Sequence, residues 1–153
     1  MALLERLRRI LPGLWAGWML CVAMLATPAA FALLDKPTAG RVVARMLAQE
    51  AYTSLAMGTL LLVLERLVAR RAAMAGQGSQ FTVGMVLALG ALFCTVVGYF
   101  ALQPMMEAAR AGQGGWSFAQ LHAASLGFFG VKGLLVLALA WRALGPVSPA
   151  PSS

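Results

Sequence analysis

Charged residues are scarce in this sequence of 153 residues. Only 11% of the residues are charged whereas 61% are hydrophobic, and five acidic residues face twelve basic ones. A composition this apolar excludes a water-soluble domain of this size and indicates a membrane protein. The two cysteines lie inside apolar runs, so we expect small packing residues there and no disulfide framework.

Motifs of catalysis and of nucleotide binding are missing as well. The single histidine has no Ser or Cys beside it in a recognised motif, and neither a P-loop nor a G-x-G-x-x-G loop occurs. We therefore expect no enzyme and no cofactor, with a haem-using oxidoreductase that has His122 as axial ligand as the weakest alternative. The basic residues lie between the apolar runs and not on one periodic face, which excludes nucleic acid as a partner.

Four apolar runs predict an all-α, polytopic membrane protein built as a four-transmembrane-helix bundle. The first, Ile10 to Leu34, has no charge over 25 residues, more than the roughly 20 that cross hydrocarbon. The second is less clean, because it reaches a spanning length only by including Arg45 and Glu50. Helices are expected at about residues 10–34, 42–66, 81–103 and 118–141, in one transmembrane domain of residues 10–142.

The two ends of the chain are expected outside the bilayer core. Residues 1–9 are predicted as an interfacial lead-in in which Glu5 is spaced to pair with Arg8 or Arg9. Residues 143–153, rich in Pro and Ser, are predicted as a disordered tail. Lys and Arg bias both ends toward the cytoplasm by seven to four: Arg6, Arg8, Arg9, Arg66, Arg70, Arg71 and Arg142 against Lys36, Arg41, Arg45 and Arg110.

The first apolar run could instead be a signal peptide, with Ala30-Phe31-Ala32 as its cleavage site. Its apolar core is longer than the about 7 to 15 residues of a signal peptide. Gly13 and Gly17 have the G-x-x-x-G spacing that lets helices approach closely, which is useful only in a retained helix. Pro28 would kink the last turns without requiring cleavage. We therefore predict a permanent first helix.

Short motifs along nearly the whole chain, about residues 11–141, resemble a known family. They are Trp15-Ala16-Gly17, the stretch Ala26-Thr27-Pro28-Ala29-Ala30-Phe31-Ala32-Leu33-Leu34, Ala39-Gly40 with Arg45, and Leu121-His122. These motifs resemble the bacterial relatives of transmembrane protein 205, small four-helix membrane proteins labelled as a domain of unknown function. The resemblance implies that Pro28 and Phe31 are packing features of helix one. It also loosely implies transport or metal handling, since a eukaryotic relative is associated with tolerance of a platinum drug.

Three ionisable residues inside the predicted helices are the candidates for an intramembrane polar site: Glu50, His122 and Lys132. Such groups cost about 2.5 to 3.5 kcal/mol each at the bilayer centre, so they need partners. Helical spacing adds Thr53 and Ser54 to the face of Glu50, and it aligns Tyr99 with Gln103. By helical rise Glu50 can reach either His122 or Lys132. Two interpretations of these residues stay open: polar contacts that hold the helices together (clasps), and a proton- or substrate-sensing site.

A soft-metal site is a weaker alternative. Met105 and Met106 with His122 would suit Cu(I), but no complete ligand array is present, so we expect no metal. The leading hypothesis is a non-enzymatic protein of the bacterial inner membrane with a transporter-like or solute- or metal-tolerance role. The alternative is a structural or assembly subunit, in which Gly13 and Gly17, or Gly127 and Gly130, dock a membrane-protein partner or a second copy. The lipid bilayer is the one partner expected in either case.

Overall fold

The computed structural model of this protein describes residues 2–76 and 79–145, and every regular element in them is helical. Four helical spans are long and apolar enough to cross a membrane. The predicted fold class, an all-α protein with four membrane-spanning helices, is therefore confirmed. Large apolar side chains remain on the outside, as a lipid-facing surface requires: Leu33 is 83% exposed and Phe81 74%. The chain is an integral membrane protein.

Eight elements make up the four spans. The first span is α1 (Ala2–Leu20), the π-helical η1 (Cys21–Ala26) and α2 (Thr27–Leu33); the second is α3 (Lys36–Met74); the third is α4 (Val83–Thr95), the π-helical η2 (Val96–Ala101) and α5 (Leu102–Arg110); the fourth is α6 (Phe118–Ala143).

These bounds differ from the expected helices mainly at the ends. The lead-in is continuous with α1, and its Glu5–Arg8 ion pair forms at 3.4 Å. The second span begins at Lys36 and runs on to Met74, whereas the expected helix covered residues 42–66. The third span continues through Pro104 to Arg110. Residues 146–153 of the expected tail lie outside the described residues.

Side-chain caps explain where three of the helices begin. Asp35 accepts a hydrogen bond from the Thr38 N–H at 3.1 Å, and this bond to the backbone lowers the pKa of the Asp35 carboxyl. Thr82 caps α4 in the same way through the N–H of Met85. Ser117 and Gln120 form a complete capping box at the start of α6.

Each π-helical segment lies just before a proline. η1 ends two residues before Pro28, and η2 ends three residues before Pro104. A proline cannot bond to the carbonyl four residues earlier and its ring presses on that carbonyl, so a wider turn relieves the conflict. The Thr27 hydroxyl also donates to the Val22 carbonyl at 2.8 Å. The predicted distortion near Pro28 thus takes the form of a π turn inside a continuous helix.

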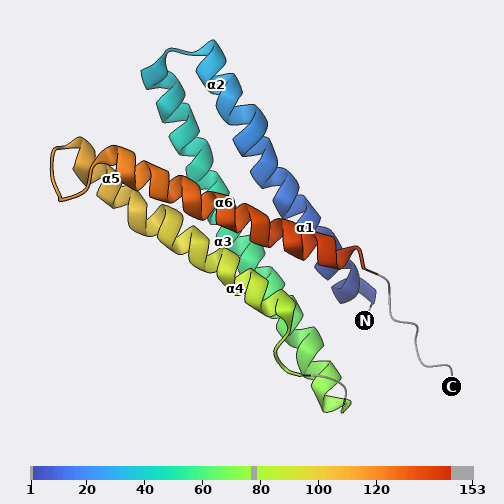
Figure 1. Ribbon diagram of the computed structural model, residues 1–153. Helices are drawn as coiled ribbons and strands as arrows, with labels where there is room; N and C mark the ends of the chain where they lie inside the picture. Colours follow the sequence, from blue (N-terminus) through green and yellow to red (C-terminus); the bar gives the residue numbers. More distant parts are fainter. Residues whose placement is uncertain (1, 77–78, 146–153) are drawn as a thin grey trace.

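The spans form two hairpins that meet at one end and diverge at the other (Figure 1). The first hairpin contains α1, η1, α2 and α3, and the second contains α4, η2, α5 and α6. We call the end where α1 begins and α6 ends the terminal side, and the end with the α2–α3 and α5–α6 connections the turn side. Toward the terminal side all four spans share one core: Trp15, Ala16, Met19, Leu61, Ala88, Ala91, Val136 and Leu139. Toward the turn side α2 packs on α3 and α5 packs on α6.

Close helix contacts occur at other glycines than those expected. A Cβ atom added at Gly98 would lie 2.5 Å from the Phe128 Cβ, and one at Gly58 would lie 2.8 Å from the Leu92 side chain. By contrast, a Cβ at any of the four glycines Gly13, Gly17, Gly127 and Gly130 would meet no other atom within 4 Å in the described part of the chain. Those four glycines face outward and do not join helices of this chain. Pro28 is exposed as well, and Phe31 is half exposed.

Candidate functional site

A buried ion pair joins the two hairpins near the middle of the bundle. The Lys132 Nζ on α6 lies 2.9 and 2.8 Å from the two carboxylate oxygens of Glu50 on α3. Both residues are almost fully buried, at 3% and 2% exposure. An isolated charge in this position would be very unfavourable, so each group depends on the other. Of the two contacts that helical rise allowed for Glu50, the structure forms the one with Lys132.

Three further side chains surround the ion pair: Ser54, Trp15 and Phe129. The Ser54 hydroxyl, one turn after Glu50 on α3, donates to a Glu50 carboxylate oxygen at 2.6 Å and accepts from the Trp15 indole N–H at 2.9 Å. The Lys132 Nζ also lies 4.9 Å from the centre of the Phe129 ring, within cation–π range. Hydrogen bonds thus connect three of the four spans, and the cluster is satisfied as a buried network must be.

A cavity lies between the diverging hairpins on the turn side, and residues of both hairpins line it. Its volume is about 450 Å³, and we call it the wedge cavity. Its lining residues come from η1, α2, α3, α4, η2, α5 and α6: Ala23, Thr27, Phe31, Gly40, Val43, Ala44, Leu47, Glu50, Cys94, Thr95, Gly98, Tyr99, Gln103, Met106, Arg110, Phe118, His122, Ser125, Leu126, Phe129 and Lys132. The exposed surface of this lining is mainly apolar, and its ionisable groups are therefore the candidates for a binding role.

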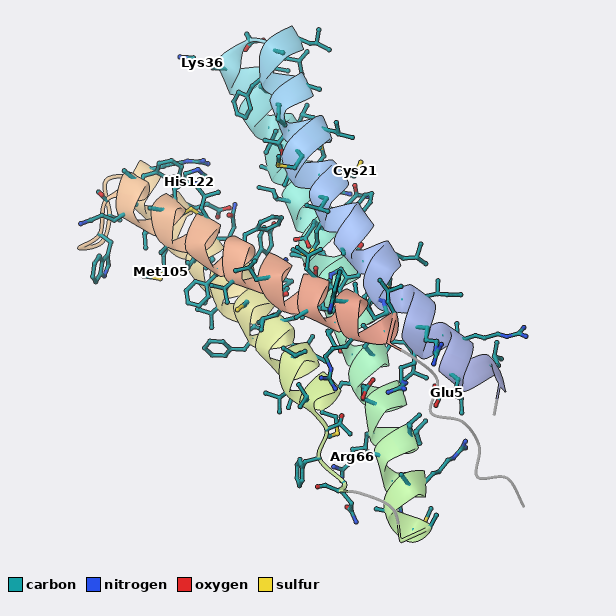
Figure 2. All side chains as sticks on the ribbon, turned by 45° about the vertical axis from the view of Figure 1, so that its right-hand side comes forward. Glu5, Cys21, Lys36, Arg66, Met105 and His122 are labelled. Atoms are coloured by element: carbon teal, nitrogen blue, oxygen red, sulfur yellow. The ribbon has the colours of Figure 1, made fainter. Side chains whose placement is uncertain are left out.

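The charged and ionisable groups Glu50, Lys132, His122 and Arg110 of the wedge cavity lie at its inner end or near the turn side. Glu50 and Lys132 form the inner end, where the shared core begins. His122 lies ten residues before Lys132 on α6, roughly 15 Å away along the helix. Figure 2 shows His122 and Met105 at the turn-side end of the second hairpin, and Lys36 at that of the first.

His122 belongs to a small stack at the cavity mouth. Its ring lies 5.6 Å from the Phe118 ring at an interplanar angle of 12°, and the Arg110 guanidinium lies 4.4 Å from the centre of the Phe118 ring. These contacts link the end of α5 to the start of α6. The exposed His122 is therefore placed at the entrance, separated from the buried carboxylate of Glu50 by the depth of the cavity.

The sequence matches the family described as a domain of unknown function, DUF4149, over residues 10–114. The chain belongs to this family. Comparisons with curated proteins and with solved structures find no match. The matched region of this DUF4149 protein holds Trp15, Glu50 and Ser54, but it ends before α6, so Lys132 and His122 lie outside it.

Most of the expected site residues gather at the wedge cavity of the DUF4149 protein. The cavity is lined by five of the seven predicted residues: Glu50, Tyr99, Gln103, His122 and Lys132. Ser54 is buried behind the ion pair, which it contacts directly. Thr53 is half-buried and is not part of the lining. Of the two methionines considered for a soft metal, Met106 lines the cavity and Met105 is exposed.

Trp15 is the site residue that sequence reasoning missed. From the sequence it was named only within a family motif, with no role at the polar site, yet its ring is fully buried and its N–H donates to Ser54. A buried tryptophan usually finds a hydrogen-bond acceptor, which was the available signal. No spacing in the sequence pairs position 15 with position 54, however, so the acceptor could not be named.

A second ion pair on the terminal side was also not expected. The Arg8 guanidinium on α1 donates to the Glu65 carboxylate on α3 at 3.1 Å, and the Thr82 hydroxyl donates to the same carboxylate at 3.0 Å. A Cβ at Gly84 would lie 2.5 Å from this carboxylate, so a glycine is needed there. Glu65 falls at the end of the second helix that the sequence predicts, residues 42–66. The longer α3 instead places it inside the bundle.

Proposed function

We propose that this DUF4149 protein is a transporter-like membrane protein that admits a small, mostly apolar solute into the wedge cavity. The observation that carries the proposal is a cavity of about 450 Å³ that ends on a buried ion pair. Ligand sites typically have volumes of about 300 to 1,000 Å³, apolar walls and a few well-placed polar groups. The wedge cavity has all three properties.

The Glu50–Lys132 ion pair could both bind a solute group and act as a gate between the two hairpins. Glu50 and Lys132 come from different hairpins, and the core beyond them is packed around Trp15 and Val136. The conformation is thus open toward the turn side and closed toward the terminal side. A solute group that competes for Lys132 or Glu50 would loosen the link between the hairpins, which is the step that alternating access requires.

The orientation in the membrane and the family resemblance add two further parts to the proposal. The excess of Lys and Arg on the terminal side favours a cytoplasmic location for both termini, so the cavity would open away from the cytoplasm of a bacterial inner membrane. The resemblance to bacterial relatives of transmembrane protein 205 supports a role in tolerance of a toxic solute or metal. In the metal case, Met106 and His122 are the two candidate ligands named from the sequence that line the cavity.

A structural or assembly subunit is the second candidate. Gly13 and Gly17 on α1, and Gly127 and Gly130 on α6, present open outward faces onto which another helix could pack closely. The two candidates place the important surface differently. A solute site needs the interior of the wedge, whereas an assembly subunit needs the outward glycines.

One pair of glycine substitutions separates these candidates. Gly40 lines the wedge cavity and a Cβ there meets nothing within 4 Å, so Gly40→Phe adds an aromatic side chain at the cavity wall at a position with room for its first atom. Gly130→Phe adds the same side chain to an outward face and is the matched control. Bacteria lacking the endogenous protein would express each variant and grow on a panel of apolar toxic solutes and of copper and silver salts, with protein levels measured by immunoblot.

The solute-site proposal predicts that Gly40→Phe abolishes tolerance at a normal protein level and that Gly130→Phe retains it. Loss of tolerance only in Gly130→Phe would favour the assembly subunit and contradict the solute site. A protective solute from the panel should also slow modification of Cys94, which lines the cavity, by methyl methanethiosulfonate in a Cys21→Ala background. An unchanged rate would contradict binding in the wedge.

A further inference from the structure

A second, smaller cavity lies at the opposite end of the bundle, on the terminal side. Its volume is about 170 Å³, and we call it the terminal cavity. Residues from α1, α3, α4 and α6 line it, and its charged lining residues are Arg8, Arg9, Glu65 and Arg142. It is separate from the wedge cavity and shares no lining residue with it.

The charges around the terminal cavity do not balance. Glu65 is already occupied, because it accepts hydrogen bonds from Arg8 and from Thr82. Arg9 and Arg142 form no ion pair or hydrogen bond within residues 2–76 and 79–145. Three guanidinium groups against one carboxylate leave the lining with a net charge of +2. The cavity therefore favours an anion.

The terminal cavity lies at the level expected for lipid headgroups. Trp141, directly before Arg142, is 80% exposed at the end of an apolar span, and such tryptophans mark the membrane interface. Figure 2 places Glu5 and Arg66 toward this same end of the molecule. Ile10 and Leu144 remain exposed near the lining arginines in the sequence and offer apolar surface to acyl chains.

We infer that the terminal cavity binds the phosphate group of an anionic phospholipid, held by Arg9 and Arg142. The planar guanidinium fork matches phosphate oxygens and remains charged at any physiological pH. Basic pockets between membrane helices are a recurrent form of anionic headgroup site. The Arg8–Glu65 ion pair forms one wall of the site and keeps the start of α1 on α3. Free phosphate offers the same chemistry, so the experiment must distinguish the two sources.

Native mass spectrometry of the full-length protein in neutral detergent measures the binding directly. Phosphatidylglycerol and phosphatidylcholine are titrated against the wild type, R9Q/R142Q and the control R66Q/R70Q. The control removes the same charge from the terminal side, but its residues do not line the cavity. We expect phosphatidylglycerol to bind the wild type about tenfold more tightly than phosphatidylcholine. R9Q/R142Q should remove this preference, and R66Q/R70Q should weaken it by no more than about threefold, since Arg66 and Arg70 do not line the cavity and act on the lipid only through screened surface charge.

Equal weakening by R9Q/R142Q and R66Q/R70Q would overturn the site, because the lipid would then respond only to surface charge. Inorganic phosphate provides the second arm of the test. Displacement of phosphatidylglycerol by equimolar phosphate would overturn the lipid as the source of the phosphate group. The single variant Arg142→Gln guards against misfolding, because Arg142 is exposed and has no partner in the described chain. It should still reduce the lipid preference several-fold, and an unchanged preference would also overturn the site.

Discussion

Removing one member of the Glu50–Lys132 ion pair should destabilise the protein far more than removing both. Lys132→Met leaves the Glu50 carboxylate buried with only the Ser54 hydroxyl as a partner, and Glu50→Met leaves the ammonium without a counter-charge. Breaking a buried ion pair costs about 3 to 5 kcal/mol. We expect about 3 kcal/mol for each single variant, because an unfolded chain in a micelle still finds polar partners.

The double variant E50M/K132M should recover most of this loss. An apolar pair of similar volume is often as stable as the ion pair it replaces, so we expect the double variant within about 1 kcal/mol of the wild type. The free energy of unfolding would be measured by dodecyl sulfate titration in mixed micelles, with circular dichroism as the signal. The two single losses and the double loss then give a coupling energy on the order of 5 kcal/mol.

Two results would refute this reasoning. Single losses below about 1 kcal/mol would mean that the charges are not confined away from water. A double loss equal to the sum of the single losses would mean that the two groups do not interact. The double variant also distinguishes a structural from a functional role of the ion pair. If it folds normally and still confers solute tolerance, the ion pair serves only to hold the hairpins together.

Two smaller predictions concern the neighbours of the ion pair and the hairpin contacts. Trp15→Phe keeps a ring in the core but removes the donor to Ser54, and it should reduce the free energy of unfolding by about 1 kcal/mol in the same dodecyl sulfate titration; no loss would show that the indole N–H is dispensable. Gly98→Ala forces a methyl group against Phe128 and should lower stability by about 1 to 3 kcal/mol, whereas Gly127→Ala should be neutral or slightly stabilising. Equal effects at the two glycines would contradict the packing described for η2.

The four spans could be predicted because membrane insertion is encoded in length and composition. A run such as Ile10 to Leu34 needs no tertiary information to be recognised. The ends were harder to place. The α3 helix begins at Lys36 and extends past Glu65 because Asp35 caps it and because Arg8 pairs with Glu65 across the bundle. Which residue pairs with a given charge depends on the tertiary structure, and local hydropathy does not contain that information.

The sequence was sufficient to name most residues of the candidate site, but not to say which of them are in contact. Ionisable groups in apolar helices pointed to Glu50, His122 and Lys132, and helical rise allowed Glu50 to contact either of the others. The choice between them depends on how the hairpins diverge, which leaves His122 at the mouth and Lys132 at the inner end. The glycine pairs Gly13/Gly17 and Gly127/Gly130 make no close contact within the described residues, and their role in docking a partner or a second copy stays a prediction. Spacing places a glycine on a face, but only packing decides what that face meets.

The two prolines offer a physical reason why the wedge cavity exists. Pro28 and Pro104 lie in the turn-side halves of the first and third spans, one in each hairpin, and each follows a π-helical segment that widens the helix. Large side chains from both hairpins, such as Phe31 and Phe129, line the wedge. On the terminal side, small residues such as Ala88 and Ala91 allow the spans to share one core. The Glu50–Lys132 ion pair lies between the wedge cavity and the shared core. Its charges therefore face the cavity on one side and packed side chains on the other. A bundle that was closely packed along its whole length would bury the same pair with no access for a solute.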